Sequence, residues 1–356
     1  MTIRLALLGL GEAAWQIDLP ACRRLPALQI VGACDPDPDR RARARSRLGD
    51  TPLYVDPNEL LSREKPDLVI IATPPDTHHA LCLLALEHGS HVFCEKPFVR
   101  HVHEADAVIE SAEQRGLMVV VNNQYPLMRI YRVARERLHR GDFGRPFLIQ
   151  VWQQLFHPPS REANWRQRLV ESTWYEFGTH PIDLVCTFFD TLPVAVTAHM
   201  PRPHPTIAAD VLVQATLRFP GDRLATFVLN RTSHALARYL EMRIDCERAS
   251  LRLSFGGVAR ASLDWSRALG RPIARLSPGK GGEARVEAGG HSRILARAWR
   301  EDRVEATALR LQGLVDAIGG GTVSNAAARH ARELIRIVAA GYESARTGET
   351  VWLGAK

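Results

Sequence analysis

The chain has 356 residues, of which 46% are hydrophobic and 24% charged, values that are ordinary for a soluble globular protein with room for two domains. The formal charge is +7, but the arginines are scattered and predict no nucleic-acid site. Six cysteines without a CxxC pair predict neither disulfides nor a metal centre. No run of about 20 apolar residues predicts a membrane span, and no cleavage-site pattern follows the short apolar start, so we expect a cytoplasmic protein.

The first predicted element is a buried strand, residues 3–8, that leads into the glycine turn GLGEAA at residues 9–14. In a GxGxxA turn the first glycine permits the tight bend, the second lets the backbone approach a pyrophosphate, and the small third residue allows close helix–strand packing. The helix N terminus then faces the phosphates. The turn residues that we assign to a dinucleotide are Gly9, Gly11, Glu12 and Ala13.

A second buried strand, residues 28–35, ends in Asp35. A carboxylate at this position can accept hydrogen bonds from the adenosine ribose hydroxyls and repel a 2′-phosphate, which favours NAD over NADP. Arg40 and Arg41 lie in the helix that follows, residues 38–48, and keep NADP open as the alternative.

Strands and helices continue to alternate up to residue 122. The strands are predicted at 66–75, 91–97 and 117–123, and the helices at 77–89 and 103–116. This alternation is typical of an α/β, doubly wound parallel sheet, whose ligands bind beyond the carboxyl ends of the strands. At or near those ends we assign to the cofactor site Thr73, Pro74, His78, Glu95, Lys96 and Asn122.

The pattern changes in residues 123–356, which we predict to form a second, α+β domain. Long strands with partial alternation indicate a large, mostly antiparallel sheet with one face covered by helices. Residues 277–290, rich in glycine, are expected to be a mobile loop or hairpin tip. One alternative has the last helix, about residues 325–347, packing back on the first domain. The predicted strands lie at 145–156, 210–219, 222–232, 238–245 and 249–255.

Seven stretches resemble the glucose–fructose oxidoreductase / inositol dehydrogenase (Gfo/Idh/MocA) family over nearly the whole chain. They are GLGEAA, ATPPDTHH, EHGSHVFCEKPF, GDFGRP, NWR, FGTHPIDL and SARTGETV. The resemblance implies an NAD-dependent oxidoreductase that moves hydride between nicotinamide and a secondary alcohol carbon of a sugar, glycoside or cyclitol. It also implies a homodimer or homotetramer formed through the open sheet face. Two alternatives are a reductase of an imine or aldehyde intermediate and a non-catalytic, cofactor-sensing regulator.

The resemblance also assigns the catalytic residues. The lysine of the EKP element, Lys96, is expected beside the nicotinamide, on the reacting oxygen. It is one of four lysines among 46 lysines and arginines, and an ammonium can share its proton with an alkoxide, whereas a guanidinium stays protonated. His180 is the expected general base, because its ordinary pKa lies near operating pH. Glu176 occupies the place where the family usually carries aspartate.

Two departures from the family pattern lie near the expected substrate pocket. Many relatives carry an arginine in the segment that reads NNQY here, at residues 122–125, and the stretch VESTWYE, residues 170–176, replaces a glycine run. An aromatic wall with a few hydrogen-bonding groups suits a polyhydroxylated ring. Beside the three catalytic residues, the predicted substrate-binding residues are Gln124, Trp165, Arg166 and Tyr175.

Overall fold

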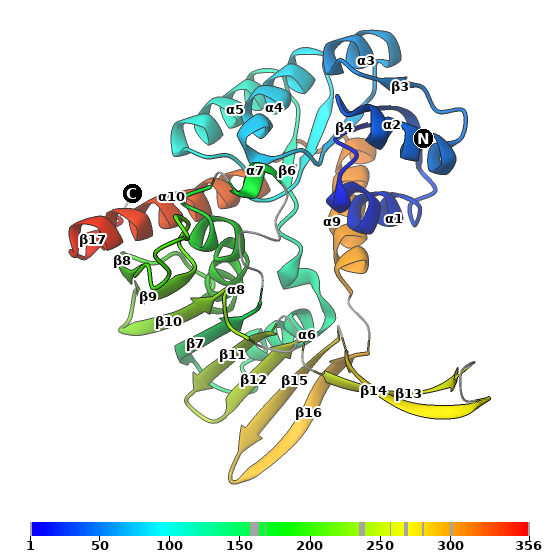
Figure 1. Ribbon diagram of the computed structural model, residues 1–356. Coiled ribbons are helices and arrows are strands. Elements are labelled where there is room, and N and C mark those ends of the chain that lie inside the picture. Colours follow the sequence, from blue (N-terminus) through cyan, green and yellow to red (C-terminus); the bar gives the residue numbers. More distant parts are fainter. Residues whose placement is uncertain are drawn as a thin grey trace. The chain divides into compact units, whose positions relative to one another are not determined.

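The computed structural model describes residues 2–156, 164–167, 169–234, 239–256, 258–266, 270–279, 281–299 and 302–354 (Figure 1). The chain divides into two compact units. The first comprises Met1–Leu127 and Arg303–Ala339, and the second comprises Met128–Asp302 and Ala340–Lys356. The helix α10 (Ala326–Thr347) passes from one unit into the other. Each unit is described by itself below.

The first unit contains a six-stranded sheet in the order β3-β2-β1-β4-β5-β6, and all its neighbouring strands are parallel. Because β1 lies between β2 and β4, the strand order reverses there, as in a doubly wound Rossmann sheet. The predicted fold class is confirmed for this half. The strands are β1 (Ile3–Leu8), β2 (Leu28–Cys34), β3 (Leu53–Tyr54), β4 (Leu68–Ile71), β5 (His91–Cys94) and β6 (Val119–Val121).

Local sequence explains where one helix of this unit begins. The helix α2 (Pro38–Leu48) begins with proline in its first turn, and the Asp37 carboxylate caps it by accepting hydrogen bonds from Asp39 N and Arg40 N. The other helical segments are η1 (Ala14–Asp18), α1 (Leu19–Cys22), α3 (Pro57–Glu64), η2 (Pro75–Thr77), α4 (His78–Glu87), α5 (Val102–Gln114), η3 (Tyr125–Leu127) and α9 (Arg303–Gly320).

The position of α9 differs from the predicted domain organisation, which placed all of residues 123–356 in the second domain. The helix carries Leu311, Leu314 and Val315 at helical spacing, and these side chains are buried in the core of the first unit with residues of β1 and β4. Burial of this apolar stripe places α9 in the first unit. Asn325 ties the next helix to β6, since its side chain accepts from Val119 N at 2.8 Å and donates to Leu117 O at 3.1 Å.

The second unit contains a nine-stranded sheet in the order β16-β15-β12-β11-β7-β10-β9-β8-β17. Only β7 and β10 pair in parallel among its described strands, so the predicted large, mostly antiparallel sheet is confirmed. The strands are β7 (Pro146–Gln154), β8 (Ala195–His199), β9 (Leu212–Phe219), β10 (Arg223–Asn230), β11 (Tyr239–Cys246), β12 (Ser250–Phe255), β15 (Gly282–Ala288), β16 (His291–Ala298) and β17 (Val351–Trp352).

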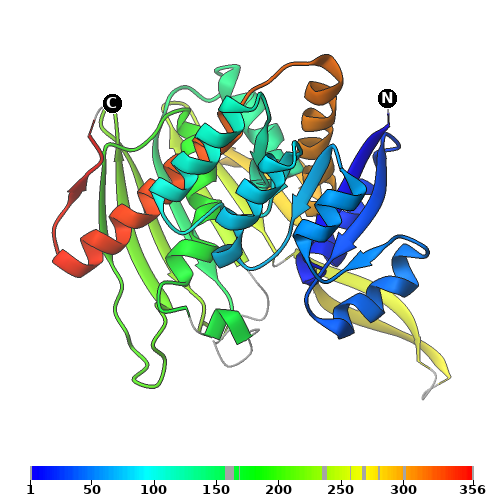
Figure 2. The same ribbon diagram turned by 90° about the horizontal axis from the view of Figure 1, so that it is seen from above.

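Helices pack on one face of this sheet. The helix α6 (Arg129–His139) contacts β12, β15 and β16, and α8 (Thr179–Phe189) contacts β7 (Figure 2). Two short segments, α7 (Asn164–Gln167) and the π-helical turn η5 (Thr173–Phe177), precede α8. Among the described residues, none of the helices combines the length and apolar character that a bilayer crossing requires.

Of the two alternatives for residues 277–290, a loop is wrong for most of the segment, and among the described residues a hairpin tip is present only at residues 289–290, between β15 and β16. Most of this segment belongs to strands, the end of β14 (Arg271–Gly279) and all of β15, while β13 (Val258–Ser266) and β14 form a separate hairpin. In β15, Ala284 and Val286 are buried and alternate with charged residues that face away from the core. The alternation was present in the sequence, but the flanking glycines concealed it.

Candidate functional site

The glycine turn after β1 has the geometry that a dinucleotide requires. Gly9 has φ of 92°, and a Cβ there would lie 2.7 Å from the Ala72 carbonyl oxygen, so only glycine is tolerated. A Cβ at Gly11 would meet nothing nearer than the Arg40 guanidinium, at 3.8 Å. The space beside Gly11 is therefore not taken by the unit itself. It forms a cradle that a side chain would fill, and a pyrophosphate suits this cradle.

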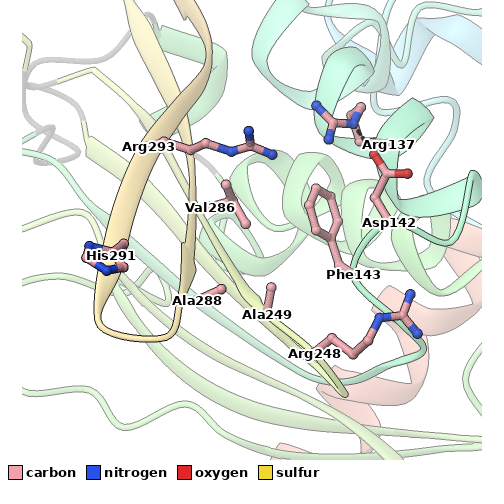
Figure 3. Close-up of a pocket in the computed structure, with 9 residues that line it drawn as sticks. All are labelled: Arg137, Asp142, Phe143, Arg248, Ala249, Val286, Ala288, His291 and Arg293. Atoms are coloured by element: carbon pink, nitrogen blue, oxygen red, sulfur yellow. Dashed lines mark hydrogen bonds and ion pairs between the residues drawn. The ribbon is translucent and has the colours of Figure 1, made fainter.

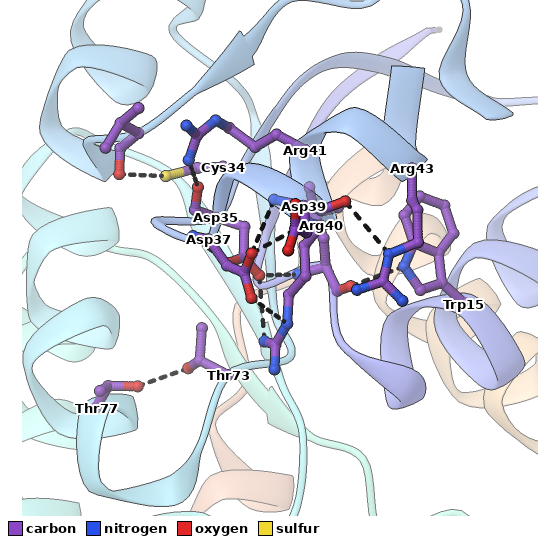
Figure 4. A network of polar contacts seen from close by, with 12 residues as sticks. Trp15, Cys34, Asp35, Asp37, Asp39, Arg40, Arg41, Arg43, Thr73 and Thr77 are labelled. Atoms are coloured by element: carbon purple, nitrogen blue, oxygen red, sulfur yellow. Dashed lines mark hydrogen bonds and ion pairs between the residues drawn. The ribbon is translucent and has the colours of Figure 1, made fainter. Parts of the chain in front are cut away.

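Asp35, which follows β2, stabilises this turn through hydrogen bonds (Figure 4). Its buried carboxylate accepts hydrogen bonds from Leu10 N at 2.8 Å and Asp37 N at 2.9 Å. The Arg40 guanidinium lies 3.5 Å from Asp35 Oδ2, and Arg41 donates to the Asp35 backbone oxygen at 2.6 Å. Asp35 therefore has a structural task in addition to the predicted contact with ribose.

His78 connects the loop after β4 to the EKP turn. The ring is fully buried, with Nε2 3.0 Å from Thr73 O and Nδ1 3.0 Å from both Pro97 O and Phe98 O. Burial lowers the pKa of His78, so the imidazole is neutral near pH 7. A neutral imidazole has a single N–H and can donate to only one of these segments, so the histidine acts on the cofactor site mainly through its buried ring, which packs between the two segments.

Lys96 follows β5 and is half-buried, and the Lys96–Pro97 peptide bond is cis. The adjacent Glu95 carboxylate is buried and accepts from Lys96 N at 3.2 Å and from Asn122 Nδ2 at 2.6 Å. Asn122 in turn lies 3.1 Å from the Thr307 hydroxyl of α9. The turn that carries Lys96 is thus fixed from β6 and α9. Gln124, a predicted substrate residue, is buried in the same unit.

Sequence analysis missed Asp18, a fully buried acid at the end of η1. Neither of its carboxyl oxygens accepts a hydrogen bond from a donor in the part of the chain that the structure describes. Burial, together with the negative charge of Glu95, raises the pKa of Asp18 well above its usual range. A protonated Asp18 can donate to Glu95. The only signal in the sequence was one acid within the apolar segment AAWQIDLPAC.

In the second unit Glu176 is part of η5. Its buried carboxylate accepts hydrogen bonds from Arg166 Nε, at 3.0 Å to Oε1 and 3.1 Å to Oε2. The Arg166 guanidinium stacks over the Trp165 ring, 4.4 Å from the ring centroid. Three predicted substrate residues therefore form one contiguous group, with the charge of Glu176 compensated by Arg166.

His180 is 5% exposed and lies in the first turn of α8, with Pro181 beside it. Pro181 lies in the first turn of this helix, where the missing N–H costs nothing. Glu176 and His180 belong to two successive helical elements, η5 and α8, which meet at Gly178. Tyr175 is buried next to Glu176.

Asp210, which sequence analysis also missed, holds the segment that leads to Glu176. Its buried carboxylate accepts the backbone N–H groups of three consecutive residues, Ser172 at 2.5 Å, Thr173 at 2.9 Å and Trp174 at 2.9 Å. The Tyr342 hydroxyl donates to Asp210 Oδ2 at 3.0 Å and accepts from Tyr175 N at 3.1 Å. Burial raises the pKa of Asp210, and the hydrogen bonds from the three backbone N–H groups offset only part of this rise.

Gly341 of α10 provides the space for the start of η5. A Cβ at Gly341 would lie 2.2 Å from Nε1 of the fully buried Trp174. Among the described residues, no group of three or more histidines, cysteines, aspartates or glutamates could hold a metal ion.

The fold and the glycine turn are those of a dinucleotide-binding protein, and a family model narrows the class to an NAD-binding oxidoreductase. Residues 3–123 match the model described as "Oxidoreductase family, NAD-binding Rossmann fold", and residues 131–252 match the "GFO/IDH/MocA C-terminal domain". The chain belongs to the Gfo/Idh/MocA family. The family that the sequence motifs predicted is confirmed.

Individual relatives are more distant. "Uncharacterized oxidoreductase C115.03" of Schizosaccharomyces pombe is 27% identical over 238 residues, which are 64% of this chain and 64% of that protein, so the match spans less than two thirds of the relative. The scyllo-inositol 2-dehydrogenase (NAD(+)) of Bacillus subtilis is 30% identical over 144 residues, 40% of this chain and 42% of the relative.

Solved structures share the fold over the full length. An oxidoreductase from Agrobacterium radiobacter, solved in complex with NAD+, L-tartaric acid and magnesium, aligns with a TM-score of 0.81 at 20% sequence identity. The alignment covers 99% of this chain and 98% of that one. At this identity the likeness establishes the fold.

Proposed function

We propose that the protein is an NAD-dependent oxidoreductase that acts on a secondary alcohol or ketone carbon of a sugar, glycoside or cyclitol. The observation that carries the proposal is the position of Lys96, half-buried at the carboxyl end of β5 on a turn fixed by Glu95, Asn122 and His78. The similarity to the inositol dehydrogenase of B. subtilis supports the substrate class.

The chain's own residues would bind, orient and deprotonate the substrate. When bound, the nicotinamide supplies the hydride chemistry. The Lys96 ammonium would hold the reacting oxygen and stabilise its negative charge. His180 would accept the hydroxyl proton during oxidation and return it during reduction. Glu176, paired with Arg166, would orient the substrate or the imidazole. The residues that would hold the dinucleotide are Gly9, Gly11, Glu12, Ala13, Asp35, Thr73 and Pro74.

A substrate panel tests the proposal. Purified protein is incubated with NAD and a set of sugars, glycosides and cyclitols, and with NADH and matched ketones, aldehydes and imines, while nicotinamide fluorescence is followed. Turnover of an alcohol or ketone that is lost in the His180→Ala variant supports the proposal. Turnover confined to aldehydes or imines, or cofactor binding without turnover of any compound, contradicts it.

For the cofactor we propose a preference for NAD over NADP, because the Asp35 carboxylate would repel a 2′-phosphate. The opposing observation is Arg40, whose guanidinium lies 3.5 Å from Asp35 Oδ2. Asp35→Asn keeps an acceptor for Leu10 N. We expect this variant to lose part of the preference for NADH, so that the NADH and NADPH dissociation constants become more nearly equal. Arg40→Ala should weaken NADPH only. A wild-type preference for NADPH of about tenfold or more would contradict this assignment.

A further inference from the structure

A pocket of about 500 Å³ lies in the second unit, at the end of the sheet that β12, β15 and β16 form (Figure 3). The elements η5 and α8 contact other strands of this sheet, namely β7, β9 and β10. Its lining comes from the last turn of α6 and the turn after it, from the β11–β12 turn, and from the β15–β16 hairpin. In the register of that hairpin Val286 pairs with Arg293, so both side chains project to one face. Gly282, on the same face of β15, lies against Ile130 of α6, which makes this the helix-covered face.

The positive charges around the pocket outnumber the negative ones. It is lined by three arginines, one histidine and a single acid, Asp142, which is already paired with Arg137. Arg248 donates to the Gly141 carbonyl oxygen. The Arg293 side chain makes no hydrogen bond or ion pair within the described ranges, and it extends across the pocket towards Phe143 and the Arg137–Asp142 pair (Figure 3).

Glu247 adjoins Arg248 in the sequence. Its carboxylate accepts from Arg145 N at 3.0 Å, forms an ion pair with the Arg145 guanidinium at 3.4 Å, and also interacts with the charge of Arg248. The Arg293 guanidinium thus lacks a carboxylate partner among the described residues, at the edge of a concave site in which positive charges are in excess. Like charges held around one cavity repel each other, and an anion between them relieves the repulsion.

The floor of the pocket is apolar. Phe143 is 3% exposed and Val286 is 6% exposed, and Ala249 and Ala288 complete the surface. The Arg137 guanidinium lies over the Phe143 ring at 5.6 Å. An apolar floor with convergent polar groups at the rim is the usual composition of a small-molecule site.

We propose that this pocket is a second ligand site that binds a small anion, a phosphate or carboxylate group attached to an apolar or ring-shaped body. The planar fork of Arg293 matches the two oxygens of such a group, and the body covers Phe143 and Val286. None of these residues belongs to the proposed oxidoreductase site, so this proposal does not depend on the proposed reaction.

Calorimetric titration with phenyl phosphate, inorganic phosphate and benzoate tests the site. Saturating NAD is present throughout, so that probe phosphates do not report the glycine turn. We expect one site per chain, with phenyl phosphate binding about tenfold more tightly than inorganic phosphate because its ring buries apolar surface. Comparison of phenyl phosphate with benzoate identifies the preferred anionic group.

Two variants and a matched control complete the test. Arg293→Ala should weaken phenyl phosphate about tenfold or more, the usual loss for a charge-assisted hydrogen bond. Arg140→Ala also removes one arginine charge, from the exposed C-terminal end of α6 and outside the pocket lining. This variant should bind like wild type. Ala288→Glu places a carboxylate in the lining and should abolish binding. Equal affinity in all four proteins, or no saturable binding in wild type, would overturn the proposal.

Discussion

At the scale of single residues, the choice of lysine at position 96 leads to the most direct prediction. Lys96→Arg keeps the positive charge but cannot release its proton at working pH, and Lys96→Ala removes the charge altogether. If Lys96 handles the reacting oxygen, both variants should bind NAD nearly as wild type does and lose about 10²-fold or more in turnover. Turnover is compared with the NADH dissociation constant from fluorescence titration. An arginine variant with near wild-type turnover would contradict the assigned role.

A second prediction concerns Asp18, which faces Glu95 and lies near the thiols of Cys22 and Cys94. Burial raises the pKa of both thiols, so they stay neutral near pH 7. In the unfolded chain Asp18 titrates near its ordinary pKa of about 3.9, whereas in the folded protein the pKa is raised. Between these two values the folded state binds more protons than the unfolded state, so the wild-type free energy of unfolding falls as pH rises.

Asp18→Asn removes this pH-dependent loss. The amide cannot ionise and can still donate to Glu95. We therefore expect the stability of the variant relative to wild type to increase between about pH 5 and pH 7, by at most about 1.4 kcal/mol per pH unit. Urea unfolding at several pH values measures the difference. A difference that does not change with pH would mean that Asp18 is ionised in the folded protein.

At the scale of elements, η5 depends on contacts from distant parts of the sequence. Asp210 accepts three consecutive N–H groups, and Tyr342 bridges Asp210 and Tyr175 N. Tyr342→Phe removes the bridging hydroxyl and leaves Tyr175 N–H buried without its acceptor, which costs about 1–3 kcal/mol of stability. Because η5 carries Glu176, we also expect turnover to fall, with NADH binding unchanged.

The matched control for this prediction is Tyr54→Phe in the first unit. It removes a hydroxyl that hydrogen-bonds Glu64 at 2.5 Å, between β3 and α3, two elements that carry no predicted site residue. Turnover should be retained there. Equal turnover in both variants would show that Tyr342 stabilises the fold without positioning the site.

The elements that the sequence predicted correctly are those with strong local signals. The strand predicted at 3–8 and the helix predicted at 38–48 coincide with β1 and α2, since a buried apolar run before glycine and a capped, proline-led helix are both local features. The π-helical turn η5 was not predicted, because the residues that hold it, Asp210 and Gly341 at Trp174, lie far away in the sequence.

The candidate site shows the same limit. Motif residues such as Gly9, Asp35 and Lys96 could be read directly, because each stands at the end of a predicted strand. Asp18 and Asp210 could not, because their importance comes from burial against Glu95 and against the backbone of η5. Spacing along the chain does not reveal either environment.

At the scale of the whole molecule, the sheet face that α6 and α8 leave uncovered has two parts. On β7 and β10 it presents apolar side chains, among them Trp152, Leu224 and Val228. On β11, β12 and β15 it presents ion pairs, such as Arg252–Glu241 at 2.8 Å and Arg243–Glu287 at 3.1 Å. Paired charges remain stable in water, whereas an extended apolar surface is typical of an interface.

We therefore predict that the chain forms a homodimer or homotetramer, with the apolar part of this face at the centre of the contact. Leu224 is 40% exposed, and Leu224→Asp would place an unpaired charge in the interface, so we expect this variant to be monomeric. The control is Val55→Asp, which changes a 55% exposed apolar residue of the first unit. Light scattering at micromolar concentration should give at least twice the chain mass of 39.7 kDa for wild type and control, and the single mass for Leu224→Asp. A single chain mass for wild type would contradict the prediction, and an unchanged assembly in Leu224→Asp would place the interface elsewhere.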